Sequence, residues 1–217
     1  MLCHYRCIFP DGDHNIVYGS WIKVINGTKP ECDVIEVECR LFAKNEVEVF
    51  YQYLHAQIYR NTTKIPSPSL PKPPEKYDVH IIILDSVGRT QFIRSMPKTI
   101  HLLREYYEAV PFRYLNKIGL NSRPNGFAFL MGKTAYQIPK SLFSRGYSSD
   151  YPEEVCKMAV DNDQFIGFRY QDAGYVTMMS EDWANGEFTW PNCRGFQKTP
   201  MDHYMKYISY LYIHIVH

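Results

Sequence analysis

The chain has 217 residues, and its 24 Lys and Arg residues nearly balance its 23 Asp and Glu residues, so the formal net charge at neutral pH is +1. A chain of this length can form one sizeable core with a small appended unit. The near-zero charge and the lack of a basic stripe argue against nucleic acid as a partner. The high aromatic content, led by 18 tyrosines, fits either a well-packed domain or a carbohydrate-type surface.

Residues 1–60 are predicted to form a small β-rich region. In CDVIEVECRLF, apolar and charged residues alternate from Ile35 to Leu41, which is typical of a half-buried strand. The segments IVYGSWIKVI and VEVFYQYLHAQIY are similarly rich in β-branched and aromatic residues.

The cysteines and sequons favour the extracellular space or the lumen of the secretory pathway. Six cysteines occur, none of them in a CxxC pair, and two glycosylation sequons begin at Asn26 and Asn61. An even cysteine count beside two sequons is typical of an oxidising compartment. Cys32 and Cys39 flank one predicted strand, so we expect each to bridge elsewhere, with Cys3 and Cys7 as candidate partners.

No targeting segment is visible at either end. The N-terminal residues MLCHYRCIFPDGDH contain no apolar signal-peptide core. The apolar run YISYLYIHIVH is far shorter than the ~20 residues that span a bilayer. We therefore expect no membrane span in this chain, and a natural start, with or without a membrane anchor, that lies upstream.

A change of pattern divides the chain. Residues 61–78 contain five closely spaced prolines, which predict an extended linker. VHIIIL at 79–84 is the continuous apolar run of a strand in a parallel sheet. The elements predicted after it are a helix over 96–109 with Pro97 near its start, a strand over 110–115, a helix after Ser122, a helix over about 152–172 closed by Gly174, and a strand over 175–180. This alternation predicts an α/β domain over 79–217, with a mostly parallel sheet flanked by helices.

Several polar residues lie where such a domain binds ligands. Asp85 follows the first strand, Ser122 precedes a helix, and Glu181 and Asp182 follow a later strand. A carboxylate at a strand end is a natural metal ligand. A hydroxyl at a helix N-terminus is favoured as its anion, and a metal bound beside it would lower its pKa further. Together these groups would suit attack on a phosphate or sulfate ester.

Each of these residues also has a purely structural interpretation. Asp85 and Ser86 could open a turn and cap the following helix, and Ser122 could be an N-terminal capping group. Glu181 and Asp182 could be a solvated loop pair. The sequence alone leaves these alternatives open.

Three blocks of the chain carry a resemblance: HIIILDSVGRTQFIRSMPKT, NKIGLNSRPNGFAFLMGK and GYVTMMSEDWANGEFTWPNCRGFQKTPMDHY. In these blocks the chain resembles an uncharacterised animal family, catalogued as domain of unknown function two-two-nine, which is grouped with sulfatases and alkaline phosphatases. YRCIFPDGDHNIVYGSW and CDVIEVEC are similar to the family's N-terminal accessory region. The resemblance implies an incomplete alkaline-phosphatase/sulfatase-like fold behind a small β-rich accessory region.

The resemblance also implies roles for single residues. Asp85 would bind a metal, and Ser122 would be the nucleophile and contact the metal. The Ser-x-Pro-Asn form, which ends at Asn125, is similar to the nucleotide pyrophosphatase branch, whose nucleophile is an unmodified hydroxyl. Sulfatases carry an arginine four residues after the nucleophile, whereas this chain has Gly126. We therefore expect phosphate esters, of small molecules or glycans, rather than sulfates, with Asn125, Glu181 and Asp182 as candidate substrate or metal contacts.

The chain departs from the superfamily at the second half of the metal site. That site is commonly completed by an Asp-His-Gly motif, but here Asp202 and His203 are followed by Tyr204. A two-metal mechanism needs ions ~3.5–4 Å apart, and the predicted ligands are too few to hold two. We therefore expect that the chain is truncated, that zinc serves the complete form but is not held stably here, and that this chain is inactive. The alternative is a non-catalytic secreted binding module that retains the fold.

Overall fold

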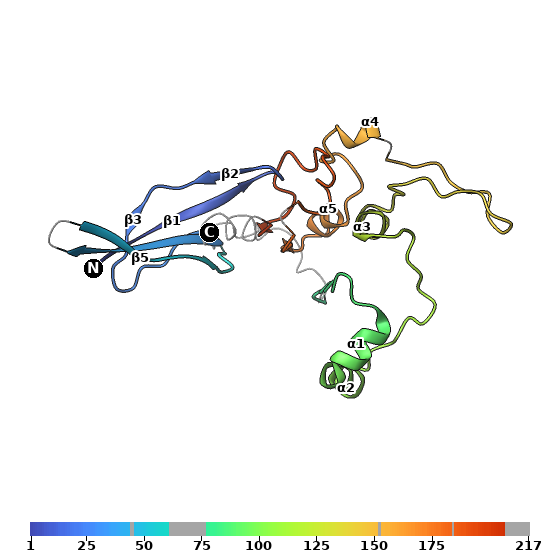
Figure 1. Cartoon of the computed structure of the whole chain (residues 1–217), viewed down its shortest axis with the longest axis horizontal. Helices are drawn as coiled ribbons and strands as arrows, with labels where there is room; N and C mark the ends of the chain where they lie inside the picture. Colours follow the sequence, from blue (N-terminus) through green and yellow to red (C-terminus); the bar gives the residue numbers. More distant parts are fainter. Residues whose placement is uncertain (44–45, 61–76, 152, 184, 207–217) are drawn as a thin grey trace, which may run out of the picture. The chain divides into compact units, whose positions relative to one another are not determined.

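The computed structural model describes residues 1–43, 46–60, 77–151, 153–183 and 185–206. The chain divides into two compact units, which are considered separately (Figure 1). One unit comprises Met1–Thr63 and Gly119–His217, and the other comprises Lys64–Ile118. The N-terminal sheet therefore shares a unit with the residues from Gly119 onward, whereas the sequence prediction placed them in different domains.

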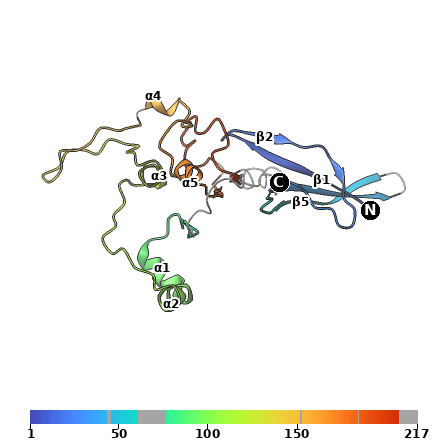
Figure 2. The same ribbon diagram turned by 180° about the vertical axis from the view of Figure 1, so that it is seen from behind.

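An antiparallel sheet forms the N-terminal part of the first unit, as the alternating pattern predicted. Its strands are β1 (Leu2–Asp11), β2 (Asn15–Tyr18), β3 (Ile22–Lys23), β4 (Val34–Ala43) and β5 (Glu46–Ala56). The order is β2-β1-β4-β5, with β3 also paired to β1. Figure 2 shows the same strands from behind.

Two disulfides lie within this sheet region. Cys3 and Cys39 are directly opposed on β1 and β4 and are bonded, and Cys7 is bonded to Cys32. The expectation that Cys32 and Cys39 each bridge elsewhere is thus confirmed. A third disulfide, Cys156–Cys193, lies in the remainder of the first unit. Three disulfides fit a secreted protein.

The rest of the first unit is built of short elements around an aromatic core. Its elements are α3 (Ser122–Met131), α4 (Glu153–Cys156), α5 (Ile166–Asp172), β6 (Met178–Met179) and β7 (His203–Tyr204). The core packs tilted or edge-on rings of Phe127, Tyr151, Phe165, Phe188 and Phe196. Helices α3 and α5 lie side by side over this core in both views (Figures 1 and 2).

The second unit contains two helices, α1 (Arg89–Ser95) and α2 (Pro97–Glu105). Pro97 is the first residue of α2, where its missing N–H is not needed, so this predicted helix start is confirmed. Among the described residues of the whole chain, no helix has the length and apolarity to cross a bilayer.

The predicted strands over 79–84 and 110–115 are wrong, because the structure assigns no strand to either segment. A buried strand needs neighbours on both edges, and no described strand pairs with these segments. Their apolar side chains are exposed, with Ile82 at 84 % and Phe112 at 78 %. Parallel pairing in the described part of the chain is confined to β6 and β7, so the extended parallel sheet is not seen there.

The predicted single helix over about 152–172 is also wrong, because it is split into α4 and α5. Asp161 and Asp163 lie between the two helices and bond elsewhere. The Asp161 carboxylate accepts the Gln197 and Lys198 amides at 2.8 and 2.7 Å, and Asp163 pairs with Lys133. These side-chain bonds compete with continued helix. Gly174 lies just beyond α5 at φ 80°, as expected of a C-terminal cap.

The buried carboxylate of Asp13 joins the β1–β2 turn to the far end of the described chain. Its Oδ2 accepts the Phe196 amide at 2.7 Å across 183 positions of sequence. Its Oδ1 accepts the Tyr204 hydroxyl and lies 3.3 Å from Lys206 Nζ. The Asp13 and Lys206 side chains are 0 % and 2 % exposed, so solvent screens this ion pair little.

We expect Asp13→Ala to lower the free energy of unfolding by ~3–5 kcal/mol, because it leaves a buried ammonium and an amide without their acceptor. Urea titration followed by tryptophan fluorescence measures this unit, since Trp21, Trp183 and Trp190 all belong to it. Asp11→Ala, at an exposed carboxylate two residues away, is the matched control and should change the value by less than ~0.5 kcal/mol. Equal effects of the two substitutions would contradict the role given to Asp13.

Candidate functional site

Ser122 is the first residue of α3, and its side chain is partly exposed. The N-cap position belongs to Asn121, which has extended backbone angles of φ −125° and ψ −176°. Ser122 is therefore not the N-capping residue, and the simplest structural interpretation of this serine does not apply. Its hydroxyl lies in the first turn, where backbone amides without intrahelical partners favour negative charge.

Asn125 fixes the loop that leads into Ser122. Its Nδ2 donates to the carbonyls of Gly119 and Asn121 at 3.0 and 2.5 Å, and its Oδ1 accepts the Gly119 amide at 3.3 Å. Asn125 lies about one turn along the helix from Ser122, and through these bonds it positions the loop backbone that precedes the serine. The predicted substrate or metal contact of Asn125 stays a prediction.

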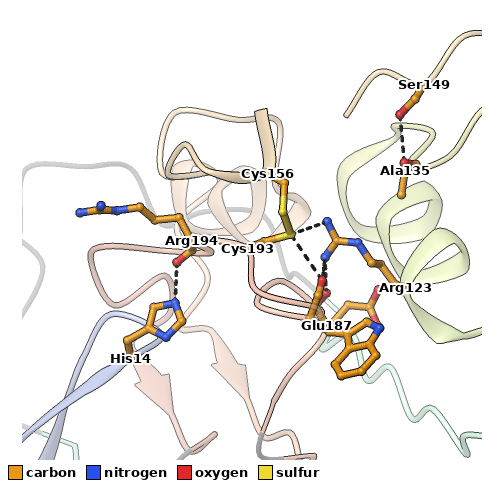
Figure 3. Close-up of a disulfide and its surroundings, with 9 residues drawn as sticks. His14, Arg123, Ala135, Ser149, Cys156, Glu187, Cys193 and Arg194 are labelled. Carbon is orange, nitrogen blue, oxygen red and sulfur yellow. Dashed lines mark hydrogen bonds between the residues drawn. A yellow bond between two sulfur atoms is a disulfide. The ribbon is translucent and has the colours of Figure 1, made fainter. Parts of the chain in front are cut away.

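Arg123 holds the same helix end from inside the protein. Its Nη1 donates to the carbonyls of Glu187 and Trp190, and its Nη2 lies 2.9 Å from Cys193 Sγ (Figure 3). The guanidinium also stacks 4.5 Å from the centre of the Phe127 ring. Burial lowers the pKa of Arg123 from its ordinary value. Because Arg123 points inward, the neighbouring Ser122 stays at the surface of the helix end.

Gly126 lets a buried carboxylate approach the same helix. A Cβ at Gly126 would lie only 2.5 Å from Cδ of Glu187, which is 8 % exposed. The Glu187 amide in turn donates to Oε1 of Glu181 at 2.7 Å. Glu181 is therefore linked to the loop that borders α3.

Glu181 and Asp182 differ in their surroundings, so the solvated-pair interpretation holds only for Asp182, which is exposed. Oε2 of Glu181 is buried and has no hydrogen-bond partner among the described residues. Burial raises the pKa of Glu181, and the nearby charge of Lys206 opposes this shift. Glu181 is thus an acid held in a poorly solvated position.

Asp85 belongs to the second unit and lies in an exposed turn with Ser86, whose φ is 58°. The N-cap of α1 is Gly88, so neither residue caps that helix as the structural alternative supposed. The two units are described separately, so the predicted convergence of Asp85 and Ser122 on one cleft stays a prediction.

The described ranges contain no cluster of three or more His, Cys, Asp or Glu side chains close enough to hold a metal ion. His203, near the C-terminal end of those ranges, instead bonds Asp33, with Nδ1 2.7 Å from Oδ2. The residues at hand therefore do not assemble a zinc site, and zinc stays a prediction. Of the two predicted glycosylation sites, Asn26 lies in an exposed turn and Asn61 lies outside the described residues.

Arg123, Glu187, Asp13 and Lys206 were not singled out in the sequence. Each is buried, and each is held by partners between 17 and 193 positions away. No periodic pattern marks such residues. Only Arg123 could have been noticed in the sequence, because it is a charged residue directly after the candidate serine on a helix that enters a core, where charged residues are unusual.

A family model described as "Protein of unknown function (DUF229)" matches residues 1–213. The chain belongs to the DUF229 family. No curated protein and no solved structure matches it.

The raised pKa of Glu181 predicts how the stability of this DUF229 chain depends on pH. Because the folded state favours the protonated acid, stability falls as pH rises from about the ordinary value of 4.5 through the folded pKa. Glu181→Gln removes this titration, so the variant should gain stability relative to the parent as pH rises from 4 to 7. Urea unfolding at several pH values, followed by tryptophan fluorescence, measures the difference.

Glu154→Gln, at an exposed carboxylate in α4, is the control and should follow the parent at every pH. If Glu181→Gln instead loses stability relative to the parent as pH rises, then the charged form is the one that the fold favours.

Proposed function

We propose that this DUF229 chain carries the nucleophile of a phosphate-ester hydrolase or transferase of the alkaline-phosphatase/sulfatase kind, and that Ser122 is this nucleophile. The observation that carries the proposal is the position of Ser122 in the first turn of α3, partly exposed, on a loop fixed by Asn125 and beside an inward-pointing Arg123. The substrate class is a phosphate ester of a small molecule or glycan.

The bond-forming step assigned to Ser122 uses its own oxygen and the helix end, and an enzymatic rate also requires cations from elsewhere. Deprotonated Oγ attacks phosphorus, a P–O bond forms, and the bond to the leaving alkoxide breaks with its electron pair, which leaves a phosphoserine. The oxygen of water or of an acceptor alcohol then bonds to phosphorus and loses its proton, and the P–Oγ bond breaks with its electron pair on Oγ. The amides of the first turn of α3 favour both the alkoxide and the phosphate oxygens.

Phosphate is favoured over sulfate because of Gly126. Sulfatases of the family that the chain resembles carry an arginine at this position for aldehyde formation. Here a side chain at Gly126 would collide with the buried Glu187 carboxyl group. An unmodified hydroxyl therefore suits this helix better, and phosphate esters are its natural substrates.

Asp85 is assigned as a metal ligand of the complete site, with zinc as the ion. Glu181 is a further candidate, because it has a buried oxygen without a hydrogen-bond partner among the described residues. Asp182, which is exposed, is assigned as a candidate substrate or metal contact. The three disulfides and the exposed sequon at Asn26 support an extracellular or secretory-lumen location.

Ser122→Ala should lower kcat for phosphodiester hydrolysis by about a thousandfold or more, because it removes the nucleophile. The measurement uses the product of the complete transcript, with zinc and bis-p-nitrophenyl phosphate. Ser122→Thr, which keeps a hydroxyl, should retain activity, and Ser149→Ala, at another serine of the same unit, should leave kcat unchanged.

The 217-residue chain alone should show no zinc-dependent hydrolysis above background, because its described residues do not assemble a metal site. Full activity of the complete product after Ser122→Ala would overturn the proposal. Zinc-dependent activity in the 217-residue chain, lost in that variant, would confirm the nucleophile and overturn the expected inactivity.

A second candidate is a non-catalytic binding module, and one surface favours it. On β5 the rings of Tyr51, Tyr53 and His55 form a triangular cluster with centroids 5.3–6.3 Å apart, and the two tyrosines are 38 % and 43 % exposed. Exposed tyrosines present apolar faces and polar edges, which is the kind of surface on which sugar rings stack.

If this module binds glycans, Tyr53→Ala should weaken binding by about threefold to tenfold, because one stacking partner is lost. A glycan array followed by titration calorimetry of any hit measures the change. Tyr77→Ala, at a tyrosine that is 90 % exposed in the second unit, is the control. Absence of any glycan binding by the parent chain would remove this candidate.

A further inference from the structure

We propose that the Cys156–Cys193 disulfide is a thiol–disulfide exchange site, at which an incoming thiolate attacks Cys156 and Cys193 leaves as a thiolate paired with Arg123.

The two sulfur-bearing residues differ in exposure. Cys193 is 3 % exposed, whereas Cys156, the last residue of α4, is partly exposed. Figure 3 shows Cys193 facing the Arg123 side chain, with Cys156 on the other side of the bond. Cys156, although it packs at the edge of the aromatic core, is the more exposed end of the bond, so we place thiolate attack there.

The environment of Cys193 favours its departure. Arg123 Nη2 lies 2.9 Å from Cys193 Sγ, and its guanidinium is buried. The arginine's other hydrogen-bond acceptors are the carbonyls of Glu187 and Trp190, and the Glu187 side chain also attracts it electrostatically. A buried cation next to a neutral disulfide gains a stronger partner when the sulfur becomes an anion.

The other two disulfides supply an internal comparison. Cys39 and Cys32 are buried at 7 % and 3 %, much like Cys193. Among the described residues, however, no cationic side chain donates a hydrogen bond to a sulfur of Cys3–Cys39 or Cys7–Cys32. The three bonds thus share a buried end, and Arg123 distinguishes one of them.

The co-reactant in the exchange is a low-molecular-weight thiol. The thiolate sulfur bonds to Sγ of Cys156, the Sγ–Sγ bond breaks, and its electron pair stays on Sγ of Cys193. The product is a mixed disulfide at Cys156 and a thiolate at Cys193. With a dithiol, the second thiol displaces Cys156, so the protein disulfide is reduced by two electrons and the dithiol is oxidised to its cyclic disulfide.

Opening this bond acts on the helix end that carries Ser122. Arg123, the next residue, would exchange a neutral sulfur for an anionic one and bind the 189–196 loop more strongly. The α4 segment would lose its covalent link and keep the bond from the Arg194 amide to the Cys156 carbonyl at 2.8 Å. The redox state of the bond is thus transmitted to the support of the candidate nucleophile.

The test treats the intact 217-residue chain with reduced glutathione for increasing times, quenches with acid, alkylates and maps the cysteines by mass spectrometry. We expect Cys156–Cys193 to open about tenfold faster than the other two disulfides, with glutathione bound to Cys156 and the alkylating agent on Cys193. Glutathione on Cys193, or equal opening rates for all three bonds, would overturn the proposal.

Arg123→Gln should slow opening of Cys156–Cys193 by about tenfold, since the leaving sulfur loses its cation. Arg194→Gln removes an exposed cation directly beside Cys193 and should leave the rate within about twofold of the parent. Near-ultraviolet circular dichroism checks the fold of each variant. If Arg123→Gln does not fold, the site of glutathione attachment in the parent chain still decides the matter.

Discussion

The ion pair between Asp13 and Lys206 is the constraint on which the first unit depends. The N-terminal sheet and the aromatic core from Gly119 onward are far apart in sequence, and this ion pair joins them together with the packing of Tyr204 in the sheet's apolar cluster and the His203–Asp33 bond. Removing two charges from water costs several kcal/mol per ion, and only further hydrogen bonds offset that cost. Asp13 has them from the Phe196 amide and the Tyr204 hydroxyl, and Lys206 has one to Thr189 at 3.1 Å. The pair therefore specifies which segments meet, since each partner is poorly solvated without the other.

The loop around residues 187–196 connects the Asp13–Lys206 ion pair to the N-terminus of α3, where Ser122 lies. Thr189 lies between Glu187, which borders α3, and Cys193, which contacts Arg123. The segment around 187–196 thus packs against the sheet on one side and supports the N-terminus of α3 on the other. Loss of the buried ion pair is therefore expected to shift this loop and, through it, the position of Ser122 at the N-terminus of α3.

Local patterns predicted local structure well. The alternation around Ile35 predicted a strand of the antiparallel sheet, Pro97 predicted a helix start, and the run after Ser122 predicted α3.

The predictions failed where structure depends on distant partners. VHIIIL has the composition of a buried strand, but a strand exists only where another one pairs with it. The split of the 152–172 helix depends on an aspartate that bonds the backbone more than 30 positions away. The support of Ser122 by Arg123 depends on a loop that the sequence pattern does not relate to α3.

The orientation of Arg123 decides what Ser122 can do without help. Its guanidinium is committed to the disulfide loop and the Phe127 ring, so it does not meet charge on a phosphate at the serine. The helix amides remain, and a helix N-terminus contributes typically 0.3–1 kcal/mol to a nearby anion, up to ~2 kcal/mol when partly buried. Enzymatic rate enhancements correspond to ~8–23 kcal/mol. The helix amides alone therefore supply only a small part of an enzymatic rate enhancement, and the phosphate-ester chemistry proposed for Ser122 requires cations from elsewhere.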